Sequence, residues 1–291
     1  GILIERPSMR SLSSTSFLPV QAVRTICGSR AARARFRLPV HGVASVSVGK
    51  PERNLENDMK HLLEEGFAAL GLELTDSAAD QFYQYFAHLE ECNRVMNLTA
   101  IAGEVDVAQL HFLDCAAILN VADFAGKRVI DVGTGAGFPG LPIKIAVPSV
   151  QMTLLDSLNK RVEFLKSTCA LLHLSDVTCI HARAEEAPED YREGFEIAVS
   201  RAVANLRVLS ELCLPFVKVG GVFLAMKGPD CTEELQEARR AIQLLGGTEL
   251  DVHRYTIPGT EIQHSIVKIR KGKPTPAKYP RRFAKIKQQP L

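Results

Sequence analysis

Residues 129–137 constrain the fold of this chain more than any other stretch. They read Val-Ile-Asp-Val-Gly-Thr-Gly-Ala-Gly: a short β-forming run that carries Asp131, followed by a turn rich in glycine. A strand that ends in such a turn exposes bare backbone at its carboxyl end, where open α/β sheets bind their ligands. The segment therefore predicts the first strand and the ligand-binding turn of a parallel α/β sheet.

Short apolar runs alternate with helical patterns from this point to the C-terminus. Strands are expected at 128–132, 151–155, 177–180, 196–200 and 221–226. This alternation predicts a doubly wound, mainly parallel α/β sheet with a Rossmann-like arrangement. Residues 252–257 and 265–269 flank a Pro258-Gly259 turn, and they predict an antiparallel pair that supplies an antiparallel last strand.

The region before the sheet has the pattern of amphipathic helices. Apolar residues recur at helical spacing around Phe67 and again around Phe82, and a third helix is expected at 105–119. We therefore divide the chain into a basic N-terminal segment (1–50), an N-terminal helical extension (51–122), the α/β domain (123–271) and a basic C-terminal tail (272–291).

Charge is divided sharply along the chain. The net charge is only +2, yet residues 1–50 carry +7, residues 268–291 carry +9, and the acidic body between them carries −14. A segment rich in Arg and Ser and nearly free of acids is typical of an organellar transit peptide, so 1–50 predicts a disordered targeting segment for a chloroplast, with a mitochondrion second. The alternative is a basic arm that stays on the protein. The C-terminal basic residues predict phosphate contact with RNA, and a solubilising tail is the alternative.

Two classes of protein are disfavoured by the sequence. The seven cysteines show no zinc-type spacing with one another or with histidines, so we expect no structural metal site. No run of 18 apolar residues is present, so we expect no membrane span.

The glycine turn is compatible with two cofactors. Gly135, Gly137 and Gly140 satisfy a dinucleotide fingerprint, and Asp156 follows at the spacing of a ribose partner. Asp131 favours S-adenosylmethionine, because a carboxylate repels a pyrophosphate and attracts a sulfonium and an ammonium group. The alternative for Asp131 is a residue that only caps a helix or supports the turn. An NAD-dependent oxidoreductase remains the alternative.

Several motifs in one order resemble those of the ribosomal RNA small subunit methyltransferase G family. They are Asn97-Leu98-Thr99, His111-Phe112-Leu113-Asp114, the segments 130–140 and 154–162, Arg183-Ala184-Glu185-Glu186, Ser200-Arg201-Ala202, Lys227-Gly228, and the C-terminal Pro274-Thr275-Pro276 and Lys278-Tyr279-Pro280-Arg281. The resemblance covers about residues 55–291. One departure is Cys115, which stands where the family usually has serine, and a thiol is a weaker hydrogen-bond donor than a hydroxyl.

This resemblance implies a class I S-adenosylmethionine-dependent methyltransferase that acts on N7 of a guanine in small-subunit ribosomal RNA. The partner is then that RNA or the assembling small subunit, with no membrane, and we expect a monomer. A non-catalytic ribosome-assembly factor with the same fold is a further alternative. The expected cofactor-binding residues are Asp131, Gly133, Gly135, Phe138, Asp156, Ser157, Ala184, Glu185 and Arg201.

N7 of guanine carries a lone pair and no proton, so its methylation needs placement rather than a general base. Arg201, His111 and Asp114 are the candidate catalytic residues. His111 and Asp114, three residues apart, can lie on one helix face, and a purely structural pair is the alternative. Arg201 is expected to hold guanine O6, a phosphate or the cofactor carboxylate, because bidentate contact with O6 and N7 would block the nucleophile.

Overall fold

The computed structural model describes residues 55–201 and 204–291. The predicted targeting segment, 1–50, lies outside the described residues. Within them, no helix is long and apolar enough to cross a membrane.

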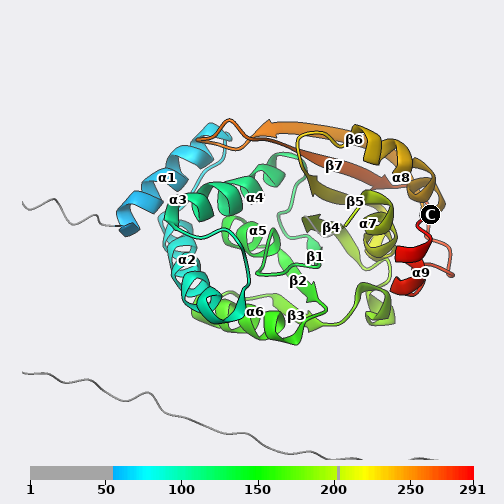
Figure 1. Cartoon of the computed structure of the whole chain (residues 1–291), viewed down its shortest axis with the longest axis horizontal. Coiled ribbons are helices and arrows are strands. Elements are labelled where there is room, and N and C mark those ends of the chain that lie inside the picture. The colour runs from blue at the N-terminus through cyan, green and yellow to red at the C-terminus, as the bar shows by residue number, and fades with distance from the viewer. Residues whose placement is uncertain (1–54, 202–203) are drawn as a thin grey trace, which may run out of the picture. The chain divides into compact units, whose positions relative to one another are not determined.

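A seven-stranded mixed sheet forms the centre of the described region (Figure 1). Its strand order is β3-β2-β1-β4-β5-β7-β6; β1 to β5 run parallel, and β7 pairs antiparallel with both β5 and β6. The strands are β1 (Arg128–Val132), β2 (Gln151–Asp156), β3 (Val177–His181), β4 (Phe195–Arg201), β5 (Val217–Lys227), β6 (Gly247–Thr256) and β7 (Gln263–Lys271). The expected doubly wound sheet with an antiparallel last strand is confirmed.

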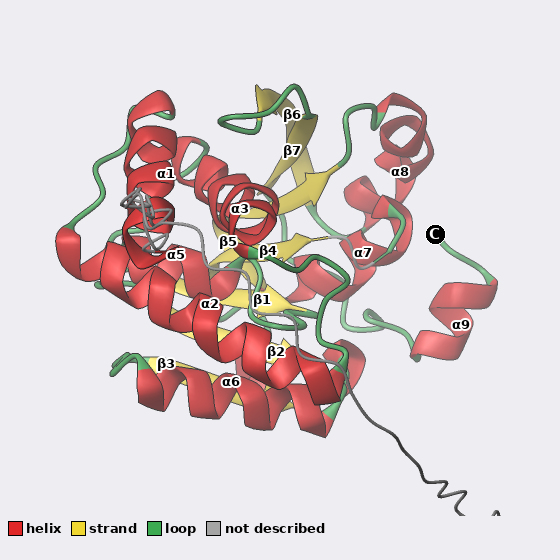
Figure 2. Cartoon of the chain, turned by 60° about the vertical axis from the view of Figure 1, so that its left-hand side comes forward, coloured by secondary structure: helices red, strands yellow, loops and turns green. Residues whose placement is uncertain are grey.

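Helices cover both faces of this sheet (Figures 1 and 2). Successive strand residues alternate between two apolar cores: Val129 and Leu154 belong to one, and Ile130 and Leu155 to the other. The helices are α1 (Leu55–Ala69), α2 (Asp76–Met96), α3 (Glu104–Val107), α4 (Asp114–Ala116), α5 (Gly140–Ala146), α6 (Asn159–Leu171), α7 (Leu206–Cys213), α8 (Thr232–Leu244) and α9 (Phe283–Gln288). The first six contribute to the first core and α7 to α9 to the second.

The N-terminal helices pack into the first core rather than forming a separate body. Phe67, Phe82 and Phe112 are fully buried and make ring contacts with one another in sequence. The third helical segment is continuous from Glu104 to Asn120, with a π-helical stretch at Ala108–Leu113 between α3 and α4. This irregular stretch carries His111, and π-helical turns of this kind are frequent at functional sites.

The C-terminal segment also packs on the body. Ile286 is fully buried, and the Arg281 guanidinium donates to both carboxylate oxygens of Glu211, which is itself 0% exposed. Arg192 donates to the carbonyls of Thr275 and Tyr279. Residues 272–291 therefore have fixed positions on the domain, although the sequence suggested only an appended basic tail.

Tyr85 joins the N-terminal helices to the glycine turn. Its side chain is completely buried on α2, and its hydroxyl donates to the carbonyl of Ala136. The Tyr85 ring also stacks on Phe138 at a centroid distance of 5.5 Å.

Removal of this hydroxyl tests the connection. Tyr85→Phe leaves a buried carbonyl without its donor, so the free energy of unfolding should fall by about 1–3 kcal/mol. Urea denaturation measures the change. Tyr83→Phe on the same helix is the matched control, because the Tyr83 hydroxyl makes no hydrogen bond within the described ranges. An equal loss in both variants would contradict the role given to Tyr85.

Candidate active site

The glycine turn leaves β1 and forms the floor of a groove at the carboxyl end of the parallel strands. Gly133, Gly135 and Gly137 have φ values of 72°, 63° and 107°, in the left-handed region that side chains disfavour. The amides of Gly133 and Thr134 both donate to the Leu155 carbonyl, which fixes the turn against β2. A Cβ atom at Gly135 would point into open space, so the backbone there is accessible to a ligand.

Asp131 lies beneath this turn rather than on its surface. Its side chain is 0% exposed, and Oδ2 accepts hydrogen bonds from the Thr134 hydroxyl and the Gly140 amide. Burial raises the pKa of Asp131 to about 7, although both hydrogen bonds act in the opposite direction. Asp131 therefore presents no exposed surface to the groove, and its carboxylate supports the turn through Thr134 and Gly140.

Asp156 ends β2 at the opposite side of the same groove. Its Oδ2 accepts from the Gly135 amide at 2.9 Å and its Oδ1 from the Leu158 amide at 2.9 Å. Arg161 Nη1 lies 3.5 Å from Oδ2. The carboxylate thus ties the glycine turn to the start of α6, and Asp156 lines the groove together with Gly133 and Ser157.

Three cavities lie in a row along this edge of the sheet. The first holds the expected Ala184 and Glu185, and the second holds Gly135, Phe138 and Arg161; Gly133, Asp156 and Ser157 line both. The third, of about 510 Å³, is lined by Ile101, Leu110, Asp114, Met226, Lys227, Gly228, Ile262 and His264 together with His111 and Arg201, which also line the second. All the predicted site residues except Asp131 therefore line one of three adjoining cavities.

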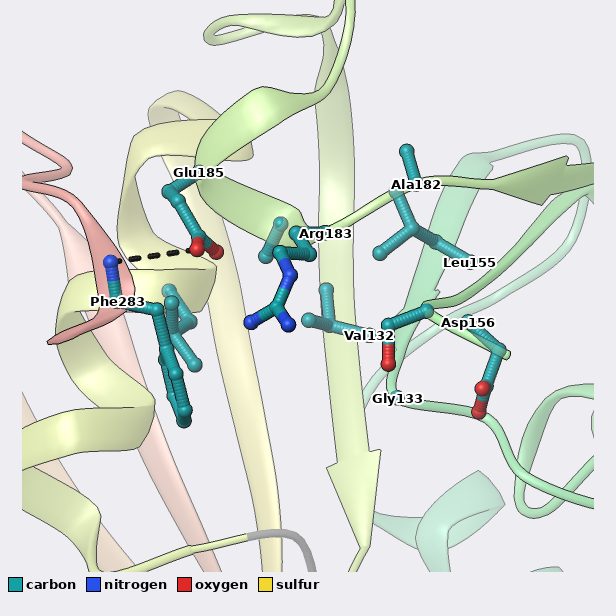
Figure 3. Close-up of a pocket in the computed structure, with 11 residues that line it drawn as sticks. Val132, Gly133, Leu155, Asp156, Ala182, Arg183, Glu185 and Phe283 are labelled. Carbon is teal, nitrogen blue, oxygen red and sulfur yellow. Dashed lines mark hydrogen bonds between the residues drawn. The ribbon is translucent and has the colours of Figure 1, made fainter. Parts of the chain in front are cut away.

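The first cavity is a mainly apolar slot (Figure 3). Val132 and Leu155 come from β1 and β2, Ala182 directly follows β3, and Leu212 and Phe283 come from α7 and α9. Figure 3 shows the Glu185 side chain directed toward the backbone of Phe283, whose amide donates to Glu185 Oε1 at 3.2 Å. The slot is therefore mainly apolar, with Arg183 and Glu185 among its polar lining residues.

Arg201 at the end of β4 separates the second cavity from the third. One guanidinium nitrogen, Nη1, donates to Asp114 Oδ2 at 3.0 Å and to the Leu110 carbonyl at 3.1 Å. The other, Nη2, lies 2.7 Å from His111 Nδ1, and the guanidinium stands over the Phe138 ring at 5.0 Å. The structure thus brings together Arg201, His111 and Asp114, as the sequence predicted.

The hydrogen bonds fix the protonation of His111. Arginine only donates, so Nδ1 must accept and the proton must be on Nε2, which then donates to the Thr99 hydroxyl at 2.8 Å. Burial and the positive charge of Arg201 lower the pKa of His111 to about 3. His111 is consequently a neutral ring that orients Arg201 and stacks on Phe138, with ring centroids 4.1 Å apart.

Asp114 is the anion that balances this cluster. Burial acts to raise its pKa, but the hydrogen bond with His264, the charge of Arg201 and the Tyr255 hydroxyl together lower it. Oδ1 accepts from Tyr255 at 2.7 Å and lies 2.8 Å from His264 Nδ1. The hydrogen bond with Asp114 raises the pKa of His264 in turn.

Sequence reasoning missed Tyr255, His264 and Phe283. Tyr255 and His264 face each other across the antiparallel pair β6–β7, but no motif marks either residue. Nor does any sequence motif mark Phe283, which lies in the basic C-terminal segment. Its proximity to Arg183 and Glu185 depends on packing between segments about 100 residues apart, which carries no local signal.

Comparisons with known proteins point in one direction. A family model described as GidB, rRNA small subunit methyltransferase G, matches residues 78–265. A protein named ribosomal RNA small subunit methyltransferase G from Alkaliphilus oremlandii is 47% identical over 237 residues, which cover 80% of this chain and 99% of that protein. A protein of the same name from Acetivibrio thermocellus is 44% identical over 238 residues, covering 81% and 98%. Among solved structures, a SAM-dependent O-methyltransferase from Thermotoga maritima is 18% identical with a TM-score of 0.45, and the match covers 64% of this chain and 72% of that one.

The Asp114 cluster yields a prediction about the ionisation of a neighbouring residue. Asp114→Asn keeps a similar shape but removes the charge, so the pKa of His264 should fall toward its ordinary value. The free energy of unfolding at neutral pH should also fall by about 3 kcal/mol or more, because Arg201 remains largely buried without its counter-ion. NMR titration of the His264 ring and urea denaturation measure the two effects. Asp106→Asn on an exposed helix position is the control. An unchanged His264 titration would contradict the pairing.

Proposed function

Because the chain belongs to the rRNA small subunit methyltransferase G family, we propose that it transfers the methyl group of S-adenosylmethionine to N7 of a guanine in small-subunit ribosomal RNA. The observation that carries this proposal is the row of three adjoining cavities. The first two suit a cofactor with an adenosine and an amino-acid end, and the third adjoins them across Arg201 and His111.

The residues present fit this cofactor. Asp156 and Ser157 lie where the first two cavities join, so they would hold the ribose hydroxyls. The apolar slot beside Ala184 and Glu185 would hold adenine, with Glu185 at its polar edge. The open backbone at Gly135 would accommodate the amino-acid end. The bound cofactor supplies an electrophilic methyl group.

The protein groups at the boundary between the second and third cavities suit a nucleophile that carries no proton. N7 of guanine attacks with its own lone pair, so the enzyme needs in-line placement and an accessible base. His111 has a pKa of about 3 and both ring nitrogens occupied, and Asp114 is fully engaged by its partners. Neither residue is available as a general base, and both position Arg201.

Arg201 retains donors for a ligand. Its Nε–H and one Nη2–H make no hydrogen bond with the described residues, and the guanidinium lines both the second and the third cavity. These donors would hold guanine O6, a phosphate or the cofactor carboxylate. Arg201 remains a candidate for the residue that contacts the reacting groups, whereas His111 and Asp114 act through it.

The C-terminal segment offers charge for RNA binding. Lys273, Lys278, Arg282, Lys285 and Lys287 are exposed, whereas Arg281 is paired with buried Glu211 and Lys271 is fully buried beside Glu193. The exposed residues would contact phosphates and offset the acidic body. The number of residues available for this contact is therefore smaller than the basic count of the sequence.

The proposed reaction has a direct test. Purified protein, small-subunit RNA or subunits, and S-adenosylmethionine should yield N7-methylguanine, detected by mass spectrometry of digested RNA. Gly133→Val places a branched side chain at φ 72° in the cofactor groove and should abolish cofactor binding in calorimetry. Gly71→Ala, at φ 69° in a turn outside the groove, controls for backbone strain. Tighter binding of NAD than of S-adenosylmethionine would instead favour the oxidoreductase. Cofactor binding without methylation of any RNA substrate would favour an assembly factor.

We further propose that residues 1–50 direct the chain to a plastid, with a mitochondrion as the second destination. Support comes from their composition: seven arginines, clustered serines and one acidic residue. Such a destination accords with a substrate of bacterial type, since the relatives named above are bacterial proteins.

A fluorescent protein fused after residue 50 tests this targeting. The fusion should enter plastids and lose the segment, whereas a fusion of residues 51–291 should remain outside. Microscopy in cells that contain both organelles reports the destination of each fusion. N-terminal sequencing of the product reports whether the segment has been removed. An intact 1–50 fusion in the cytosol would contradict the targeting role.

A further inference from the structure

Phe283 forms a wall of the first cavity although it comes from the opposite end of the chain. Its side chain lines the same slot as the strand residues Val132 and Leu155 and as Ala182, which directly follows β3 (Figure 3). The Arg183 guanidinium lies over the ring at 5.9 Å from its centroid. The slot is therefore closed on one side by α9 and not by the sheet or its loops alone.

The backbone of Phe283 also holds the polar residue of the slot. Its amide donates to Glu185 Oε1 at 3.2 Å, and Glu185 comes from the loop after β3. A carboxylate fixed by one oxygen keeps its other oxygen in a defined direction. Phe283 thus contributes the apolar wall and the orientation of the polar edge together.

The position of α9 is itself fixed from several sides. Immediately before the helix, Arg281 binds both oxygens of fully buried Glu211 on α7. Ile286, on the helix itself, is completely buried in the second core. Beyond the helix, Arg207 donates to the carbonyls of Pro290 and Leu291. These contacts hold Phe283 on rigid structure, as a binding wall requires.

From these contacts we infer that α9 completes the cofactor site, with the Phe283 ring against the adenine and its amide orienting Glu185. This inference rests on the proposed function. If α9 forms part of the site, cofactor binding and docking of the C-terminal segment on the domain are coupled. A ligand that binds only when the segment is docked stabilises the docked state. Arg282, Lys285 and Lys287 are exposed on the same short segment. The bound cofactor would therefore stabilise the position of basic side chains that can contact RNA.

Substitution of Phe283 in the full chain tests the wall. Phe283→Leu keeps an apolar side chain but removes the ring, and it should raise the dissociation constant of S-adenosylmethionine about fivefold. Phe283→Ala should raise it by about tenfold or more. The dissociation constant of 5′-methylthioadenosine, which lacks the amino-acid end, should rise by the same factors. Gln288→Ala, at an exposed position of the same helix, is the matched control and should bind like the wild type. Wild-type affinity in both Phe283 variants overturns the inference.

Limited proteolysis tests the coupling without substitution. Trypsin cleavage after Arg282, Lys285 and Lys287 should slow when the wild-type protein is saturated with S-adenosylmethionine, and this protection should be lost in Phe283→Ala at the same concentration. Unchanged cleavage on cofactor addition to the wild type overturns the coupling. Failure of the proposed function has a different signature: the wild type itself would bind no S-adenosylmethionine or would methylate no RNA. A wild type that methylates RNA and Phe283 variants that bind as tightly would refute only the role of α9.

Discussion

The ion pair between Asp114 and Arg201 joins the parts of the molecule that form the site. Asp114 belongs to the N-terminal helical region and Arg201 ends the fourth parallel strand, while Tyr255 and His264 reach the same carboxylate from the antiparallel pair. A largely buried charge persists only when it is paired and hydrogen-bonded, so the three regions must meet in one arrangement. That arrangement places the guanidinium between the second and third cavities, where a cofactor and a base would meet.

The glycine turn depends on support from both faces of the sheet. Asp131 holds it from beneath through Thr134 and Gly140, and Tyr85 holds the Ala136 carbonyl from the helical side. The turn itself contains three glycines in the left-handed region, where they are unstrained but conformationally free, so contacts with the surroundings are needed to fix it. The N-terminal helices therefore contribute to the site. Tyr85 on α2 positions the turn, and the ring of Phe138 packs against Tyr85 and Phe112.

The structure divides the basic residues near the C-terminus into two kinds, paired and exposed. The basic excess after residue 267 includes groups that neutralise buried carboxylates, such as Arg281 with Glu211, and groups that remain exposed. Only the second kind is available to RNA. Neighbouring residues of this segment therefore have different roles. Arg281 stabilises the domain, Phe283 lines a cavity, and Arg282 and Lys285 present positive charge to the solvent.

The sequence by itself determined the parallel sheet, its antiparallel end and the groove residues that follow β1, β2, β3 and β4. It could do so because periodicity, glycine turns and carboxylates at strand ends are local signals, and parallel strands bring their carboxyl ends to one edge. It also predicted that His111, Asp114 and Arg201 belong to the site. Only the tertiary structure decided that Asp131 lies under the turn, that His111 is a neutral orienting ring, that Tyr255 and His264 bind the Asp114 carboxylate, and that Phe283 lines the first cavity. Burial, tautomer and contact between distant segments are properties of packing, and no local pattern of residues encodes them.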